Sequence, residues 1–409
     1  MKIALIHFDL TTESGDPRMV LSIAKALHEL GHSITVYTSE FIPEKCFPGL
    51  HKDLRVVVFP PRAPFSSVRG ASGIFARVLE RYKRNALYSD AALRVFRGLE
   101  KDFDYLIFEN DYSYKIGVHY RKINPKTRLV WIINNVPFFH SKKESWLLNL
   151  ASSVSSISEK VSARKHASGI DWIVVYDETA KALAVQIGPP VKIMRTPVDF
   201  KRFYAPPKRY EKNKQDVLRL ISIGALSPQR RFEDTISTIS ILRRKGYNAR
   251  ALIISKDYWA NQEYRRRFLA FVKESGVEGY LDIRLEGATD DEFLKSYRES
   301  DVFIFPNNIK IWGVGAFEAM AAGLPVVVSR VSDVASPLKD GESAMIVDPL
   351  RPDQIAAAVT SLVENPELYS RVAAGGQKVV QDQFTLENYA KEILIPPSSA
   401  QAIPPPHPL

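Results

Sequence analysis

The sequence predicts an α/β protein with two doubly wound parallel-sheet domains that face a central cleft. Short apolar runs alternate with helical patterns along most of the 409 residues. The runs are apolar almost throughout, which is typical of parallel strands covered by helices on both faces. The alternation is interrupted once, by a charged stretch with three prolines at residues 197–215, and then begins again. Sheets of this kind bind ligands beyond the carboxyl ends of their strands.

The first domain is predicted to span residues 1–196. It begins with a strand at 2–7, followed by a helix at 17–30 whose apolar residues recur with helical spacing. Asp16 is the candidate N-cap of that helix and Gly31 the candidate C-cap. The other predicted strands of this domain are residues 33–38, 54–59, 104–108, 129–133 and 171–175.

Residues 216–381 are predicted to form the second domain, after a linker at 197–215 that lacks helical periodicity. A C-terminal helix at 382–395 is expected to pack back on the first domain, and residues 396–409 are expected to be a flexible tail. The predicted elements of the second domain are strands at 218–223, 249–254, 281–285, 301–305 and 325–329, with helices at 232–245 and 261–275.

Composition restricts the class of protein. Apolar residues make up 45% and charged residues 25%, which is ordinary for a globular chain and not typical of a disordered one. The single cysteine, Cys46, excludes a disulfide framework and a cysteine-type zinc site. No apolar run reaches the length of a membrane-spanning helix, and Asp9 and Glu13 come too early for a signal peptide. We therefore expect a cytoplasmic protein.

The net charge of +10 is concentrated in the predicted first domain. Residues 61–100 hold eight Lys or Arg against three Asp or Glu, and residues 115–166 hold ten against two. This asymmetry indicates an anionic partner or a solvated basic face. An anionic membrane surface or a phosphorylated substrate would fit the first reading. Nucleic acid is not the expected partner, because no recognisable RNA- or DNA-binding module accompanies the charge.

The most informative segment is residues 301–329, in which a strand is followed by a loop, a helix and another strand. Glycines at the helix start leave its backbone N–H groups open to close approach. These groups lack intrahelical partners and lie at the positive end of the helix dipole, which suits a diphosphate. Glu318 would accept hydrogen bonds from ribose hydroxyls, or would only complement the dipole. The candidate diphosphate-binding residues are Gly313, Val314, Gly315 and Ala316.

A second segment, residues 221–236, ends a strand at Gly224 and begins a helix after Arg230 and Arg231. Guanidinium groups at that edge would reach phosphate oxygens in the same cleft, or would simply lie on the surface. The only Asp-x-Asp sequence, at 102–104, directly precedes a predicted strand and is interpreted as structural. No histidine has metal-ligand spacing, so no metal site is expected.

Two segments carry a resemblance to a known family. GALSPQRRFEDTI (224–236) and WGVGAFEAMAAGLPVVVS (312–329) resemble motifs of glycosyltransferase family 4, which are retaining, sugar-nucleotide-dependent enzymes of the GT-B fold. The N-terminal half resembles the subgroup that holds the dolichol-pathway α-1,3/1,6-mannosyltransferase, on the residues ALIHFDL, ALHELGHSITVYT and EKCFP. The resemblance covers roughly residues 1–395.

The resemblance implies that a sugar moves from a nucleotide sugar to an acceptor hydroxyl with retained anomeric configuration. It implies that Glu318 binds the ribose and that Arg230, or Arg231, is the phosphate cation. Gly15, in a reduced glycine-rich loop, would approach the donor phosphates or the acceptor. The nucleotide sugar is a co-substrate, and no cofactor or metal is required. The subgroup implies mannose from GDP-mannose and a glycan or polyprenyl-diphosphate-linked acceptor at a cytosolic membrane face.

Three positions depart from the family pattern. Lys310 stands where a Glu associated with the donor sugar is expected; it would meet a charged sugar or the diphosphate, or would leave the enzyme impaired. Ala225 stands where an Arg is expected, which leaves Arg230 as the phosphate cation. Asn135 replaces a histidine and can hydrogen-bond a sugar hydroxyl but cannot act as a base. Arg230, Asn135 and Lys310 are the candidate catalytic residues, and the alternative function is a catalytically weak transferase acting as a nucleotide-sugar-binding or regulatory protein.

Overall fold

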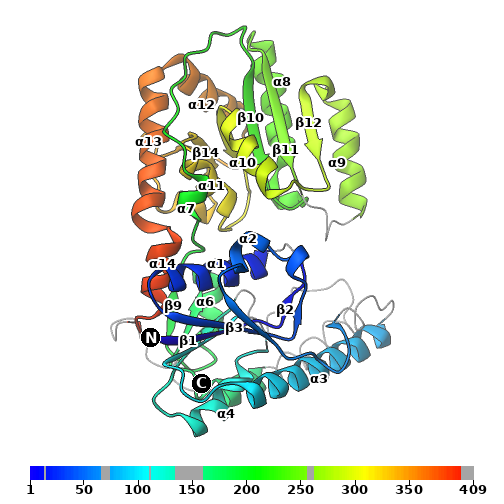
Figure 1. Ribbon diagram of the computed structural model, residues 1–409. Helices are drawn as coiled ribbons and strands as arrows, with labels where there is room; N and C mark the ends of the chain where they lie inside the picture. Colours follow the sequence, from blue (N-terminus) through cyan, green and yellow to red (C-terminus); the bar gives the residue numbers. More distant parts are fainter. Residues whose placement is uncertain (13–14, 66–73, 110–111, 134–159, 256–261, 398–409) are drawn as a thin grey trace, which may run out of the picture. The chain divides into compact units, whose positions relative to one another are not determined.

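The chain forms two compact units, each an α/β sheet with helices on both faces (Figure 1). Residues 1–195 together with 386–409 form the first unit, and residues 196–385 form the second. The computed structural model describes residues 1–12, 15–65, 74–109, 112–133, 160–255 and 262–397.

The first unit is built on a seven-stranded sheet, with β2 (Asp9–Leu10) and β4 (Glu40–Phe41) paired beside it. All of its neighbouring strands are parallel, and each predicted strand is present within one residue at either end. In sheet order the strands are β5 (Arg55–Val58), β3 (Ser33–Thr38), β1 (Lys2–Ile6), β6 (Tyr105–Glu109), β7 (Arg128–Ile132), β8 (Trp172–Val175) and β9 (Val191–Ile193).

The helices of the first unit cover both faces of this sheet. They are α1 (Gly15–Glu29), α2 (Pro48–His51), α3 (Ile74–Gly98), α4 (Lys115–Ile123), α6 (Glu178–Ala184) and α14 (Leu386–Ile393). Side chains of β1 alternate between the two faces, because successive residues of a strand point in opposite directions. Ala4 and Ile6 join the core beside α3 and α4, whereas Ile3 and Leu5 join the core beside α1 and α14.

The boundaries of α1 correct one prediction. The helix begins at Gly15, so Asp16 lies in its first turn and is not the N-cap. A carboxylate there still complements the positive end of the helix dipole, which explains why acidic residues suit both positions. At the other end, Gly31 has a φ of +85°, the left-handed conformation that a C-terminal glycine supplies.

The second unit is a six-stranded parallel sheet whose strands follow the order third, second, first, fourth, fifth, sixth. This is the strand order of a doubly wound nucleotide-binding sheet. In that order the strands are β12 (Leu281–Arg284), β11 (Ala249–Ile254), β10 (Leu218–Ile223), β13 (Val302–Phe305), β14 (Val326–Ser329) and β15 (Met345–Val347).

Helices again cover both faces. One core contains side chains of α8 (Phe232–Arg244), α9 (Gln262–Glu274) and α12 (Pro352–Glu364). The other contains side chains of α7 (Phe200–Phe203), α10 (Asp290–Glu299) and α11 (Val314–Ala321), and α13 (Pro366–Gln383) contributes to both. Among the described residues, no helix is both long and apolar enough to cross a bilayer.

The segment 197–215, which the sequence predicts to be a linker, lies in the second unit. It contains the short helix α7, and its apolar side chains are buried: Phe203 joins one core and Tyr210 the other. Val198 also forms a bridge to Thr385. The segment is rich in prolines and charges, and its three buried apolar residues, Val198, Phe203 and Tyr210, are too widely spaced to show helical or strand periodicity. These three residues attach the segment to the second unit.

Each sheet has one point where the strand order reverses. In the first unit it lies between β1 and β6, and in the second between β10 and β13. Loops that leave neighbouring strands in opposite directions open a crevice at such a point, and ligands of doubly wound sheets bind there.

Candidate active site

The two motifs singled out in the sequence meet at the reversal point of the second unit. Gly224 directly follows β10, and the loop after β13 leads to Gly313 and α11. β10 and β13 are neighbouring parallel strands, so their carboxyl ends lie at the same edge of the sheet. Asn308 N–H donates to the Gln229 carbonyl at 3.2 Å, which joins the two loops.

The N-terminus of α11 is open. Gly313 has extended backbone dihedrals, and no side chain caps the helix. Among the described residues, the N–H groups of Gly313, Val314 and Gly315 have no acceptor. Ala316 differs from the prediction, because its N–H donates to the Gly313 carbonyl at 3.2 Å. Three of the four predicted amides therefore remain available to an anion.

Aromatic packing fixes this turn. A Cβ on Gly313 would lie 2.1 Å from Cζ of Phe305, so only glycine lets the chain pass the ring. Trp312 stacks on Phe317 at 4.3 Å, and its Nε1–H donates to the Thr196 carbonyl at 3.2 Å. The backbone that presents the amides is thus held by buried rings before any ligand arrives.

Arg230 lies against the same ring. Its Cζ is 5.6 Å from the centre of the Phe305 ring, and a Cβ on Gly224 would lie 3.0 Å from its Nε. The side chain is partly buried, and burial lowers the pKa of its guanidinium. Within the described part of the chain, no carboxylate lies at ion-pair distance from it. The site therefore holds a desolvated cation that lacks a counter-charge beside an open helix N-terminus.

Arg231, the second predicted donor cation, has a different environment. It has a φ of 54°, in the left-handed region, and its guanidinium pairs with Asp234 at 2.6 Å. The side chain thus stabilises the first turn of α8. Of the two neighbouring arginines, Arg230 is the one whose charge is not already matched by an acidic side chain.

Glu318 is held by a residue that the sequence did not single out. Tyr297, fully buried on α10, donates its hydroxyl to Oε2 of Glu318 at 2.9 Å and lies 3.2 Å from the Gly315 carbonyl. The carboxylate lies on α11 one turn after Gly315. Tyr297 therefore fixes one oxygen of the predicted ribose ligand and also contacts the turn that presents the amides.

Buried polar atoms without a partner mark the same edge. Ser255 Oγ, Asn307 Nδ2 and Ser329 Oγ are buried and have no hydrogen-bond partner among the described residues. They lie at the carboxyl ends of β11, β13 and β14. A buried unpaired polar group costs about 1–3 kcal/mol, so three at one edge indicate a surface shaped for a polar ligand. Single serines and asparagines carry no sequence signal, and the sequence analysis therefore missed them.

Three predicted site residues remain: Lys310, Gly15 and Asn135. Lys310 is exposed on the loop before α11. Gly15 is exposed at the start of α1, in the first unit, and a Cβ there would meet nothing within 4 Å. Asn135 lies outside the described residues.

The reversal point of the first unit holds a buried ion pair. His7 follows β1, Glu109 ends β6, and His7 Nδ1 contacts a carboxylate oxygen of Glu109 and its backbone carbonyl. Burial alone would lower the pKa of His7, but the charge and hydrogen bonds of Glu109 prevail and raise it to about 9. The sequence gives no hint of this partner of His7, which lies 102 residues away.

The Asp-x-Asp sequence is confirmed as structural. Asp102 accepts a hydrogen bond from Lys2 Nζ at 2.6 Å, and Asp104 accepts one from the Lys2 backbone N–H at 2.7 Å. These contacts attach the start of β6 to the start of β1. In the described part of the chain, no three His, Cys, Asp or Glu side chains are grouped so that they could hold a metal ion.

Comparison with known proteins shows which family and which solved structures the chain resembles. The family described as "Glycosyl transferases group 1" matches residues 207–379, most of the second unit. Mannosylfructose-phosphate synthase of Agrobacterium fabrum is 21% identical, over 92% of this chain and 84% of that protein.

Solved structures share the fold along nearly the whole chain. Alr3699/HepE of Anabaena, in complex with UDP and glucose, covers 96% of this chain and 98% of its own, with 15% identity and a TM-score of 0.65. Sucrose-phosphate synthase of Thermosynechococcus elongatus covers 96% and 97%, with 16% identity and a TM-score of 0.67. The chain is therefore a glycosyltransferase with the GT-B fold, and its residues 207–379 match the model of the group 1 glycosyltransferases.

Proposed function

We propose that the protein is a retaining glycosyltransferase whose nucleotide-sugar donor binds the second unit at the carboxyl edge of β10 and β13. The observation that carries this proposal is the Arg230 guanidinium, which is desolvated and lacks an acidic partner beside the open N-terminus of α11. A diphosphate would supply the missing negative charge and accept hydrogen bonds from the amides of Gly313, Val314 and Gly315. Glu318 would receive the ribose hydroxyls.

The same groups would act on the leaving nucleotide. Negative charge grows on the β-phosphate as the anomeric C–O bond breaks, and donors already in place stabilise that charge without rearrangement. Arg230 is held by Phe305 and Gly224, and the amides by Gly313 and Trp312, so the orientation of both is fixed by the fold. The acceptor hydroxyl would then attack the anomeric carbon from the same face from which the leaving group departs, which retains the anomeric configuration. We propose that this chemistry requires no metal ion.

Substitution of Arg230 tests the site. Because one such donor contributes about 10²–10³ in kcat, Arg230→Gln should lower donor turnover by that factor. The far-ultraviolet circular dichroism and Tm should stay close to the parent values, since the side chain has no ion pair to lose. Arg244→Gln, at the exposed end of α8, is the matched control and should keep full activity. Equal turnover in parent and Arg230→Gln would refute the assignment.

The donor sugar is proposed from the relatives. The Anabaena structure holds UDP and glucose, and the Agrobacterium relative is named for mannosyl transfer, so glucose and mannose nucleotides are the first candidates. GDP-mannose remains our proposal from the N-terminal resemblance to the dolichol-pathway subgroup. A thermal-shift series with UDP-, GDP- and ADP-sugars would decide, because ligand at 100 times its Kd stabilises the protein by about 2.7 kcal/mol.

The acceptor is proposed from charge. The basic stretches of the first unit, 61–100 and 115–166, would favour an anionic acceptor such as a polyprenyl diphosphate at a membrane surface. Each basic residue near an anionic surface contributes about 1 kcal/mol, and salt screens it. Flotation with phosphatidylserine vesicles should therefore retain the protein at low salt and release it at high salt. Absence of the protein from the vesicle fraction at both salt concentrations would favour an acceptor free in solution.

A further inference from the structure

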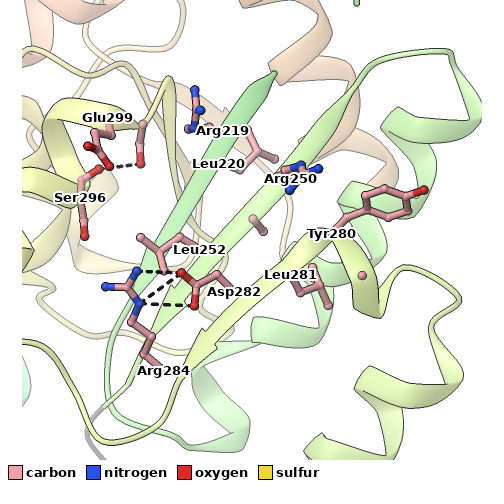
Figure 2. A pocket seen from close by; sticks show the side chains of 13 residues that line it. Arg219, Leu220, Arg250, Leu252, Tyr280, Leu281, Asp282, Arg284, Ser296 and Glu299 are labelled. Atoms are coloured by element: carbon pink, nitrogen blue, oxygen red, sulfur yellow. Dashed lines mark hydrogen bonds and ion pairs between the residues drawn. The ribbon is translucent and has the colours of Figure 1, made fainter. Parts of the chain in front are cut away.

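A pocket lies on the second unit, on the sheet face opposite α8. Its volume is about 220 Å³, and it is lined by β10, β11 and β12 together with the last turn of α10 (Figure 2). On this face α10 contacts β10, while Arg250 of β11 and Asp282 of β12 remain exposed. The volume is smaller than that of a drug-sized site and suits a small ligand.

Two arginines dominate the pocket. Arg219 on β10 and Arg250 on β11 are partners in the parallel register, so their side chains leave the same face of the sheet on neighbouring strands (Figure 2). Strands lie about 4.8 Å apart, so like charges on paired residues of neighbouring strands repel each other. Within the described residues, neither guanidinium has a hydrogen-bond or ion-pair partner.

The other charged side chains and the serines of the pocket are already engaged. Asp282 is paired with Arg284 at 2.8 Å, and Glu299 with Lys295 at 3.8 Å. The hydroxyls of the two lining serines, Ser296 and Ser300, donate to helix carbonyls at 2.7 Å. The positive charge of the two arginines is therefore not neutralised by the acidic residues around it.

A third cation strengthens the local potential. Lys208 donates to the Arg298 carbonyl at 2.6 Å and to the Ser300 carbonyl, beside the end of α10. Burial lowers the pKa of Lys208 most, Asp301 opposes this effect, and the charges of Lys212 and Arg219 lower the pKa further. The Asp301 carboxylate, which accepts a hydrogen bond from the Arg219 backbone N–H at 2.8 Å, offsets part of this positive charge.

This pocket is separate from the donor site. Arg219, on β10, and Gly224, directly after that strand, are five residues apart, which corresponds to about 16 Å of extended chain. None of the predicted donor residues lines the pocket. A ligand bound there would leave the α11 N-terminus and Arg230 accessible.

We propose that the Arg219–Arg250 pocket is a second anion site that binds a phosphate group, free or as a phosphate monoester of a small metabolite. Two guanidinium groups on the same sheet face and on adjacent strands supply several N–H donors, and guanidinium groups bind phosphate through paired hydrogen bonds. The bound dianion removes the repulsion between the two side chains. This site goes beyond the proposed donor chemistry and does not depend on it.

Isothermal titration calorimetry with inorganic phosphate and with glucose 6-phosphate tests the proposal. The titrations use the full chain carrying Arg230→Gln, which removes the cation of the donor site, so that the Arg219 and Arg250 variants report on the pocket. Phosphate should bind with one site per chain, and Arg250→Gln or Arg219→Gln in that background should weaken binding by about tenfold or more. Arg244→Gln is again the control and should change nothing. Tighter binding of the sugar phosphate would identify a metabolite as the source, and equal binding of the two would identify free phosphate.

Thermal denaturation separates loss of binding from loss of fold. In phosphate-free buffer, Arg250→Gln should melt no lower than the control, because it removes a repulsive charge. In phosphate buffer at equal ionic strength, the Tm of the parent should rise, and the Tm of Arg250→Gln should not. Phosphate binding of equal strength in Arg219→Gln, Arg250→Gln and the control, or no binding to the Arg230→Gln parent, would overturn the proposal.

Discussion

Removing the Tyr297 hydroxyl should weaken donor binding without unfolding the protein. Tyr297→Phe deletes the hydrogen bond to Glu318 Oε2 but keeps the ring, which packs 5.8 Å from Phe203 and 6.1 Å from Phe303. A hydrogen bond to a charged group contributes about 1.5–3 kcal/mol, which corresponds to roughly a 10- to 150-fold change in an equilibrium constant. We expect a loss of donor affinity within this range.

The kinetic pattern should be specific. Glu318 would contact the ribose both before and during the reaction, so the loss should raise KM for the donor and leave kcat nearly unchanged. The assay is a donor titration by initial rates, together with a direct Kd for the nucleoside diphosphate. Glu318→Gln should raise the same KM.

Tyr247→Phe is the matched control. Tyr247 is also buried, and its hydroxyl donates to the Glu364 carboxylate at 2.5 Å, but it lies at the amino end of β11, on the opposite edge of the sheet. Tyr247→Phe should lower the free energy of unfolding without changing donor affinity. An unchanged donor KM in Tyr297→Phe would refute the role assigned to Tyr297. An equal rise of the donor KM in Tyr247→Phe would also refute it.

Three further outcomes follow from the geometry. The pKa of His7 is raised from 6.5 to about 9, so the ion pair should stabilise the first unit by about 3 kcal/mol below pH 6.5. This contribution should be lost as the pH rises through 9. Urea unfolding of the parent protein should show the loss, and urea unfolding of His7→Gln should not. Gly313→Ala should lower both stability, by about 1–3 kcal/mol, and donor affinity, because its Cβ would displace Phe305 from under Arg230; unchanged calorimetric Tm and Kd would contradict this. Gly15→Ala should leave the unfolding free energy within about 0.5 kcal/mol, because a Cβ there meets open space, and a fall in activity at unchanged Tm would support its contact with a ligand.

The fold could be predicted because its signals are local. Buried parallel strands such as 218–223 are continuous apolar runs, and the structure has β10 over the same residues. The start of α11 at Val314 was also predictable, since Gly313 and Gly315 mark a turn that needs close backbone approach. The burial of segment 197–215 could not be predicted, because it depends on contacts with strands and helices distant in sequence.

The candidate site divides in the same way. Gly224, Arg230 and Glu318 stand in motifs with recognisable spacing, whereas the partner of Glu318 comes from another helix 21 residues earlier. The difference between Arg230 and Arg231 was equally invisible, because it depends on which side chain turns toward Asp234 and which lies on Phe305. The pair of His7 and Glu109 forms only when β1 and β6 become neighbours. Side-chain partners across the sheet thus require the tertiary structure.

The return of α14 to the first unit has a consequence for biosynthesis. Tyr389, Ala390 and Ile393 complete the core beside α1, yet the ribosome makes them after the whole second unit. The second unit is contiguous in sequence and can reach its native state while the first still lacks one helix. Nascent chains that stop before residue 386 would therefore carry a finished donor half and leave apolar side chains of α1 uncovered, where chaperones would recognise them.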